Sequence, residues 1–365
     1  MFLLILLLGV LVTHAEEPEF KAPSPAINRL VSAAESNSNI PGGSVRVVAG
    51  ETVLFDKYFG TLDANSNTAW DDQTVVAIAS ISKSITATLT AILVGEGKLN
   101  FADPIDQYLP EYAQLKLTPS GDSVRSPSIA ECLSHTSGLP GGTLSQLPRN
   151  SPVHQGDQAD VARYLAEQGL VTEPGTKYAY SFRGFAVVSR VIEVVMDRPF
   201  AEVLQDKLLD PLGMSETTFT PDVAMSRRIP AYAARARGRS DEEVAALIKR
   251  FRARRGSFVN VAGSLFSTPD DLQRFLQFHA DRGQVDEQQI VPSETLAELY
   301  HPQPASPGYG LGFNIRRGNI VGHGGATGTT AQVDLESGRI VIVLTQAGAT
   351  NARPLTAGAL RVGFP

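Results

Sequence analysis

Ala79-Ser80-Ile81-Ser82-Lys83-Ser84 is the stretch from which both the fold and the chemistry of this sequence can be approached. A serine and a lysine three residues apart on a helix are neighbours on the same face. If Ser80 opens the helix, burial of Lys83 favours its neutral amine, which can take the proton of the serine hydroxyl. The backbone N–H of Ser80, in the first turn, has no acceptor within the helix and can face an oxyanion. The stretch therefore predicts a nucleophile, its base and half of an oxyanion hole.

Further short blocks support this interpretation, since a Ser-x-x-Lys pair alone arises roughly once by chance in a chain of average composition. They follow one another between Pro41 and Thr345 and include Pro41-Gly42-Gly43, Tyr108-Leu109-Pro110-Glu111, Leu133-Ser134-His135-Thr136-Ser137-Gly138-Leu139, Pro174-Gly175-Thr176, Asp210-Pro211-Leu212-Gly213-Met214, Tyr309-Gly310-Leu311-Gly312-Phe313 and Gly322-His323-Gly324-Gly325-Ala326. With these blocks the sequence resembles the serine β-lactamase-like superfamily, which includes class C β-lactamases, low-molecular-weight penicillin-binding proteins and β-lactamase-fold esterases.

Strand patterns stand near both ends of the chain. Apolar and β-branched residues predict two strands over 44–49 and 52–59, joined as a hairpin at Gly50-Glu51. A second pair of strands is predicted over 330–335 and 339–345. The chain between the two pairs is mostly helical in pattern.

This arrangement and the resemblance lead to the same fold class. We expect an α/β fold in which an antiparallel sheet is flanked by helices and carries an inserted, mostly helical lobe. The lobe with the sheet should take about residues 22–75 and 262–365, and the helical lobe about residues 76–261. The active site should lie between the two lobes.

The resemblance implies that Tyr180 completes the catalytic group. Tyr180-Ser181-Phe182 stands where the family has Tyr-x-Asn, and the phenol would relay protons between serine, water and leaving group. The family's Asn hydrogen-bonds the acylamido side chain of β-lactams and peptides, which an aromatic ring cannot do. We therefore expect Phe182 to contact substrate and to favour esters, and a Phe182→Asn change to shift specificity towards β-lactams.

The segment His323-Gly324-Gly325 stands where β-lactamases have Lys-Thr-Gly. His323 would hold a substrate carboxylate less firmly than a lysine, because an imidazole is cationic only part of the time near neutral pH. Gly324 and Gly325 would let substrate lie against the strand backbone. The resemblance also implies that the N–H of Ala326 is the second oxyanion donor, beside that of Ser80.

Other reactive side chains are expected to be structural. His135 should be packed and hydrogen-bonded, since the family uses its block to close a helix. No pair of histidines has metal-ligand spacing, so neither a metal nor another cofactor is expected. The single Cys132 cannot form an internal disulfide and should be a small buried residue.

The first 15 residues have the pattern of a signal peptide, with an apolar run from Phe2 to Val12 and a cleavage site before Glu16. The run is too short to span a bilayer as a helix, so we expect export to the periplasm or the medium without stable membrane insertion after cleavage. A net charge of −6 argues against a nucleic-acid partner.

The sequence thus predicts a serine hydrolase that acts through a Ser80 acyl-enzyme on a small acyl compound. An ester is favoured over a β-lactam or a D-amino-acid amide. The alternative is a penicillin-binding or ligand-binding module with little or no turnover. The substrate, the oligomeric state and the role of the basic segment 221–256 stay open at this point.

Overall fold

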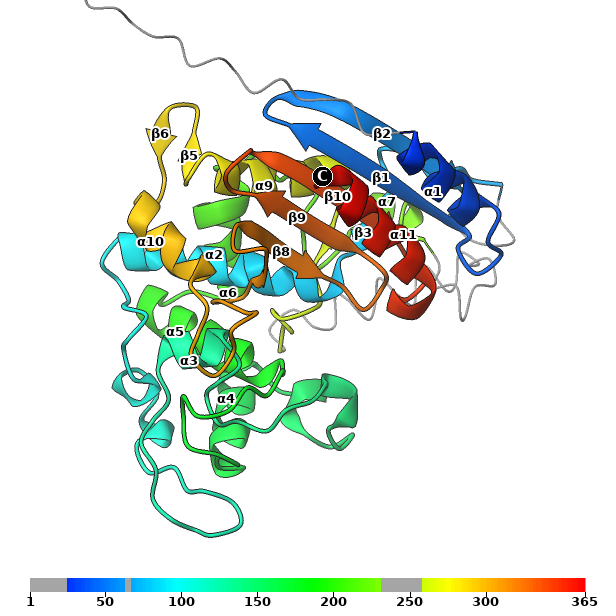
Figure 1. Ribbon diagram of the computed structural model, residues 1–365. Coiled ribbons are helices and arrows are strands. Elements are labelled where there is room, and N and C mark those ends of the chain that lie inside the picture. The colour runs from blue at the N-terminus through cyan, green and yellow to red at the C-terminus, as the bar shows by residue number, and fades with distance from the viewer. Residues whose placement is uncertain (1–24, 63–66, 231–257, 365) are drawn as a thin grey trace, which may run out of the picture.

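The computed structural model describes residues 25–62, 67–230 and 258–364 of the chain (Figure 1). The predicted signal peptide and most of the basic segment 221–256 lie outside the described residues, so both stay predictions. None of the described helices is both long enough and apolar enough to cross a membrane.

A six-stranded antiparallel sheet forms the centre of the larger lobe, with the strand order β2-β1-β10-β9-β8-β7 (Figure 1). The strands are β1 (Gly42–Ala49), β2 (Thr52–Gly60), β7 (Asn314–Arg316), β8 (Ile320–Gly324), β9 (Thr330–Asp334) and β10 (Arg339–Thr345). Both predicted strand pairs are confirmed. They lie side by side because β1 pairs with β10, with Val45 opposite Val343. This pairing brings the two ends of the chain together in one sheet.

Helices cover both faces of the sheet, which explains why β1 and β10 are buried along their whole length. One face carries α1 (Ala26–Glu35) and α11 (Ala349–Gly363), and the other carries α9 (Pro269–Ala280) (Figure 1). Val45 and Val341 pack with the first pair of helices, whereas Ile342 and Val333 belong to the core of the opposite face. The alternation of side chains along each strand produces this division.

The second lobe is mostly helical and packs around α2 (Ser82–Gly95), which lies beneath β8 (Figure 1). Its helices are α3 (Ile129–Leu133), α4 (Gln158–Glu167), α5 (Arg183–Met196) and α6 (Phe200–Leu204). Shorter elements outside this lobe's centre are β3 (Val76–Ala77), β4 (Phe266–Ser267), β5 (Gln284–Val285), β6 (Gln288–Gln289) and α10 (Ser293–Ala297). Helix α7 (Val223–Arg227) lies near β3 beside the sheet (Figure 1). The predicted fold class is confirmed, while the proposed boundary between the lobes stays a prediction.

Helix α2 is buried on all sides although it contains several hydroxyl side chains. Burial of a hydroxyl is tolerated when it is hydrogen-bonded. Thr88 and Thr90 donate to the carbonyls of Ser84 and Thr86, one turn earlier, at 2.8 and 3.0 Å. The helix that begins beside Ser80 is therefore anchored in the core, and its N-terminal turn is fixed in place. Cys132 is also buried, as expected.

Candidate active site

The nucleophile segment begins with a strained residue. Ala79 has a φ of 47°, a backbone conformation that costs a non-glycine residue on the order of 1–3 kcal/mol. The strain is held by neighbours, since Ile78 N–H donates to the Leu265 carbonyl at 3.0 Å and Ser82 Oγ donates to the Ala79 carbonyl at 2.7 Å. Ser80 lies in the first turn of the short helix Ala79–Ile81, partly exposed, where a backbone N–H has no intrahelical acceptor.

Lys83 lies one turn after Ser80 and is 3% exposed. Its Nζ is 3.4 Å from Ser80 Oγ and donates to the Ala262 carbonyl at 2.9 Å. Among the described residues no carboxylate compensates its charge, and burial lowers the pKa of Lys83 to about 7. The amine is therefore neutral in a large share of molecules at physiological pH, with a lone pair next to the serine hydroxyl.

Tyr180 contacts the same two groups. Its ring centre lies 4.7 Å from Lys83 Nζ, and its hydroxyl has a hydrogen bond with the Ser80 side chain that partly offsets the rise in Tyr180 pKa caused by burial. The side chain is 37% exposed, so the phenol can exchange protons with a bound molecule or water. The structure thus brings together all three residues that the sequence predicts to be catalytic.

The loop after β8 closes against the nucleophile segment. Gly325 packs so tightly that a Cβ there would lie 2.6 Å from the Ile78 carbonyl oxygen. Thr327 donates to the Ala77 carbonyl at 2.8 Å, which ties the loop to the strand that leads into Ser80. Ala326 lies between these anchors and, together with Ser80, lines the cavity described next. Only a glycine at 325 permits this approach.

A cavity of about 590 Å³ opens at Ser80. Tyr180, Gly324, Gly325 and Ala326 line it close to the nucleophile. Further residues from the sheet and from α11 also line it, among them Arg316, Thr330, Gln332 and Arg353. No sequence motif includes these arginines. A predicted helix over Ala349–Gly363 could have indicated Arg353, but the sequence pattern does not predict that helix.

Comparison with known proteins agrees with this geometry. A sequence model of the family described as Beta-lactamase matches residues 27–362. The chain belongs to the Beta-lactamase family.

Individual relatives of this β-lactamase-family chain are distant. It is 27% identical to penicillin-binding protein 4 of Amycolatopsis lactamdurans over 335 residues, which are 87% of this chain and 83% of that protein. It is 28% identical to protein Rv1367c of Mycobacterium tuberculosis, and the alignment covers 70% of this chain but only 66% of that protein. The solved structure of EstCE1, a hydrolase with promiscuous acyltransferase activity, superposes with a TM-score of 0.75 at 18% identity, over 92% of this chain and 98% of that one.

The side chain of His323 has a different environment from the one that the sequence predicts for a residue that binds a substrate carboxylate. It is 4% exposed, and burial lowers its pKa to about 3, helped by the neighbouring charge of Lys83. Its Nδ1–H donates to the Gly324 carbonyl at 2.6 Å, and its Nε2 lies 3.1 Å from the Tyr309 hydroxyl. Both ring nitrogens are occupied and the ring is neutral. The geometry therefore does not support a contact between His323 and a substrate carboxylate.

His323 is the end of a hydrogen-bonded chain that crosses the site behind Tyr180. Ser181 N–H donates to His135 Nδ1 at 3.2 Å, so His135 carries its proton on Nε2, which lies 3.3 Å from the Tyr309 hydroxyl. Tyr309 in turn donates to Nε2 of His323. Backbone groups at both ends fix the two tautomers. The expected structural role of His135 is confirmed, and the chain links the loop of Tyr180 to the strand of His323.

Phe182 also differs from the expectation. Its side chain is 5% exposed and packs edge to face on Phe258, with ring centres 6.4 Å apart. It is not among the residues that line the cavity in the described part of the chain. The ring fills the core at the start of α5, so the geometry does not support direct contact with a substrate. The amide of the family's motif is still absent, as the sequence indicates.

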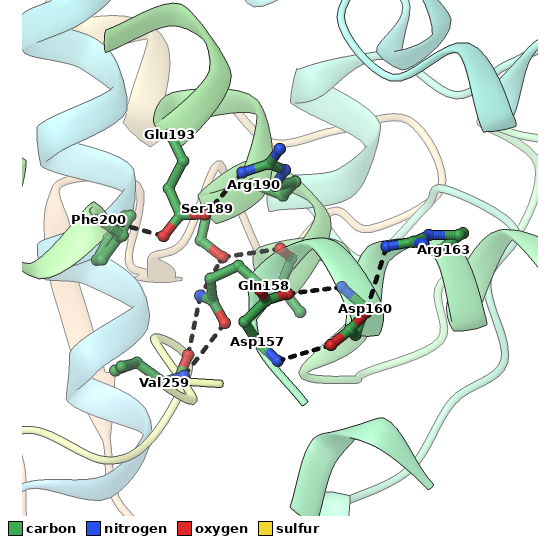
Figure 2. A network of polar contacts seen from close by, with 10 residues as sticks. Asp157, Gln158, Asp160, Arg163, Ser189, Arg190, Glu193, Phe200 and Val259 are labelled. Carbon is green, nitrogen blue, oxygen red and sulfur yellow. Dashed lines mark hydrogen bonds and ion pairs between the residues drawn. The ribbon is translucent and has the colours of Figure 1, made fainter. Parts of the chain in front are cut away.

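A second polar network lies behind Lys83 and joins α4 and α5 to the segment at Val259 (Figure 2). Gln158 is 4% exposed, and its Oε1 accepts from Val259 N–H while its Nε2 donates to the Val259 carbonyl, both at 3.1 Å. Its Nε2 also lies 2.7 Å from Ser189 Oγ. Three residues later the Ala262 carbonyl holds Lys83. Gln158 therefore fixes the segment that positions the base.

Potential metal ligands do not gather in this site. Within residues 25–62, 67–230 and 258–364, no group of three or more His, Cys, Asp or Glu side chains could hold a metal ion. The chemistry that the described residues can provide is that of a serine, an amine and a phenol.

Proposed function

We propose that the protein is a serine hydrolase that forms an acyl-enzyme at Ser80 and acts on esters in preference to β-lactams. The carrying observation is the buried Lys83 amine, 3.4 Å from Ser80 Oγ with a pKa of about 7. An amine of this pKa is near the optimum for a general base at neutral pH.

In the acylation step the neutral Lys83 takes the Ser80 proton while Ser80 Oγ forms a bond to the substrate carbonyl carbon. The negative charge that develops on the carbonyl oxygen is held by the N–H groups of Ser80 and Ala326. The tetrahedral intermediate collapses, the bond to the leaving alcohol breaks, and the alcohol takes a proton through Tyr180 or the Lys83 ammonium. Water then attacks the acyl carbon and gives a proton to Lys83 or Tyr180. The bond between that carbon and Ser80 Oγ breaks, the acid leaves, and the same group passes the proton to Ser80 Oγ.

The preference for esters rests on the two positions that depart from the motifs. A β-lactam would find no amide at Phe182, because the ring there is buried and apolar. It would find no cation at His323, because that ring is neutral and both its nitrogens are occupied. A site that lacks the partners of a polar substrate discriminates against that substrate. An ester needs neither partner.

The test combines labelling and turnover. A fluorophosphonate probe should label the wild type and not Ser80→Ala, whose folding is checked by circular dichroism and thermal unfolding. Wild type should hydrolyse 4-nitrophenyl butyrate with a higher kcat/KM than nitrocefin, and Ser80→Ala should lose at least about a thousandfold in kcat. Absence of labelling would favour a binding module without turnover, while faster hydrolysis of nitrocefin would overturn the ester preference.

A further inference from the structure

The cavity at Ser80 continues beyond the catalytic groups, along helix α11. It shares Arg316, Gln332 and Leu360 with an adjoining cavity of about 270 Å³. This second cavity also reaches Arg361 near the end of α11. The two cavities form one groove on the face of the sheet that carries α11, and we call it the α11 groove.

Positive charge is concentrated in the α11 groove. Four arginines line it, and they are Arg316, Arg317, Arg353 and Arg361. No Asp or Glu is among its described lining residues, although the chain as a whole has a net charge of −6. A groove of one sign with low-dielectric walls concentrates counter-ions. The α11 groove therefore attracts anions towards Ser80.

The buried side chain of Gln332 lines the floor of the groove. Gln332 is 3% exposed and lines both cavities, and its Nε2 donates weakly to Thr330 Oγ1 at 3.4 Å. Its Oε1 has no hydrogen-bond partner among the described residues. Buried polar atoms are nearly always paired in folded proteins. The Oε1 atom itself has almost no exposed surface, so a ligand in the groove would reach it only after a change of the Gln332 rotamer.

The arginines are spaced along an apolar strip. Arg353 and Arg361 are eight residues apart on α11, which corresponds to about 12 Å along the helix axis. Ala357 and Leu360 line both cavities, in the middle of the groove, and Ile320 and Phe364 line its distal end. A ligand that fits these walls has an apolar middle and an anionic end placed well beyond the scissile bond.

We propose that the α11 groove is a distal subsite for acyl substrates that carry an anionic group at the end of an extended apolar chain. Arg361 at the distal end and Arg316, which lines both cavities, bind the anion, and Arg353 lines the part of the groove that contains Ser80. The inference rests on the proposed function, because it assigns a substrate class to the same Ser80 chemistry.

Two pairs of esters test the proposal and leave open which side of the scissile bond enters the groove. In the first pair the 4-nitrophenyl monoester of sebacic acid is compared with the corresponding monoamide, which has the same length and no charge. In the second pair the butyrate ester of 10-hydroxydecanoic acid is compared with that of 10-hydroxydecanamide. At low ionic strength we expect the carboxylate to exceed the amide in kcat/KM by about tenfold in at least one pair, and added salt to reduce the ratio.

The variants Arg316→Gln and Arg361→Gln should each lower that ratio by about fivefold, and Arg361→Gln, whose side chain lines only the adjoining cavity, should leave kcat/KM for the uncharged ester within twofold. Arg149→Gln is the matched control, since it removes one exposed arginine from the helical lobe outside the groove. The control should keep the wild-type ratio. A ratio near one in both pairs, or a ratio that responds to Arg353→Gln but to neither distal variant, would overturn the distal subsite.

Failure of the proposal and failure of the proposed function give different results. If the Ser80 chemistry is wrong, the uncharged esters are not hydrolysed and the fluorophosphonate probe does not label Ser80. If only the distal subsite is wrong, wild type still hydrolyses the uncharged esters and the probe still labels Ser80. The ratio of kcat/KM for carboxylate to that for amide is then the same in wild type, Arg316→Gln and Arg361→Gln.

Discussion

The segment that carries Ser80 and the strand that faces it use their polar side chains in opposite ways. Lys83 Nζ donates to the Ala262 carbonyl at 2.9 Å and lies 3.4 Å from Ser80 Oγ, so in its neutral form the amine has a lone pair for the serine hydroxyl. His323 has a partner on each ring nitrogen and no capacity left for a ligand. Both are buried, and burial lowers the pKa of both. From this difference we infer that hydrogen-bonding capacity left over after folding, rather than burial or a shifted pKa, separates the candidate base Lys83 from His323.

Lys83→Arg tests this comparison with the largest expected effect. A guanidinium stays protonated, so it cannot take the Ser80 proton, and kcat/KM should fall by about a hundredfold or more. In wild type, log kcat/KM should rise with pH to a plateau, with a midpoint at about 7, because the amine acts in its neutral form. A pH–rate profile on 4-nitrophenyl butyrate measures both effects. A flat profile between pH 5 and 9 would remove Lys83 from the role of base.

The same pKa shift predicts how stability depends on pH. The folded protein binds fewer protons at Lys83 than the unfolded chain between about pH 7 and the ordinary lysine pKa. The cost of burying the charged amine is therefore fully present below pH 7 and is relieved as pH rises. Lys83→Met should raise the free energy of unfolding at pH 6, and its advantage over wild type should shrink towards pH 10 in urea titrations.

Phe182→Asn addresses a residue that departs from the family's motif and lies in the core at the start of α5. Since the ring is 5% exposed and packs on Phe258, the change should destabilise the fold by about 3 kcal/mol through lost packing and a buried amide. The motif alone predicts that the change increases nitrocefin turnover. We expect instead that kcat/KM for nitrocefin does not increase relative to that for the ester. Thermal unfolding and the ratio of the two kcat/KM values measure this. A tenfold shift of that ratio towards nitrocefin would show that the ring contacts substrate.

The proximity of Ser80 and Lys83 could be predicted from the sequence, whereas the orientation of Phe182 and His323 could not. The distance between Ser80 and Lys83 follows from helix geometry over three residues, which is a local property. Whether Phe182 and His323 face the cavity depends on contacts with Phe258 and Tyr309, which are 76 and 14 residues away. No periodicity in the sequence encodes those contacts.

Helix α11 shows the same limit for the fold. It contains Pro354 and two glycines, which disfavour a helix when the local sequence is considered alone. In the structure Gly358 lies against Leu30 and Gly363 against Val341, so small residues are needed where the helix meets α1 and β10. Tertiary packing thus overrides the local preference. The sheet strands were predictable because their alternation reflects a burial pattern that spans only a few residues.

Tyr309→Phe tests the hydrogen-bonded chain behind Tyr180. Loss of the hydroxyl leaves Nε2 of His323 without its donor and Nε2–H of His135 without its acceptor. We expect kcat/KM to fall by about tenfold, roughly the free energy of one net hydrogen bond. Tyr112→Phe is the matched control, since it removes an equally buried hydroxyl that donates to the Ala162 carbonyl in the helical lobe. If both variants lose the same stability and neither loses activity, the chain does not position the site.

Gln158→Leu has the smallest expected effect and tests the network behind the base (Figure 2). The change removes the two hydrogen bonds that hold Val259 and leaves its N–H without an acceptor, which should loosen the segment that ends at the Ala262 carbonyl. Because a carbonyl stabilises the ammonium of Lys83 more than the amine, a looser contact should lower the Lys83 pKa. The midpoint of the pH–rate profile should therefore move below about 7, with a two- to threefold decrease in kcat/KM on the plateau.

A loss of stability alone would not support this role, so the control must lose a similar hydrogen bond elsewhere. Gln277→Leu removes a glutamine on α9 that donates to Asp281 at 2.9 Å, far from the segment at Val259. Both variants should lower the free energy of unfolding by about 1 kcal/mol. Only Gln158→Leu should move the midpoint, because only Gln158 is joined through Val259 to the carbonyl that Lys83 contacts. An unchanged midpoint in both variants would reduce Gln158 to a structural residue.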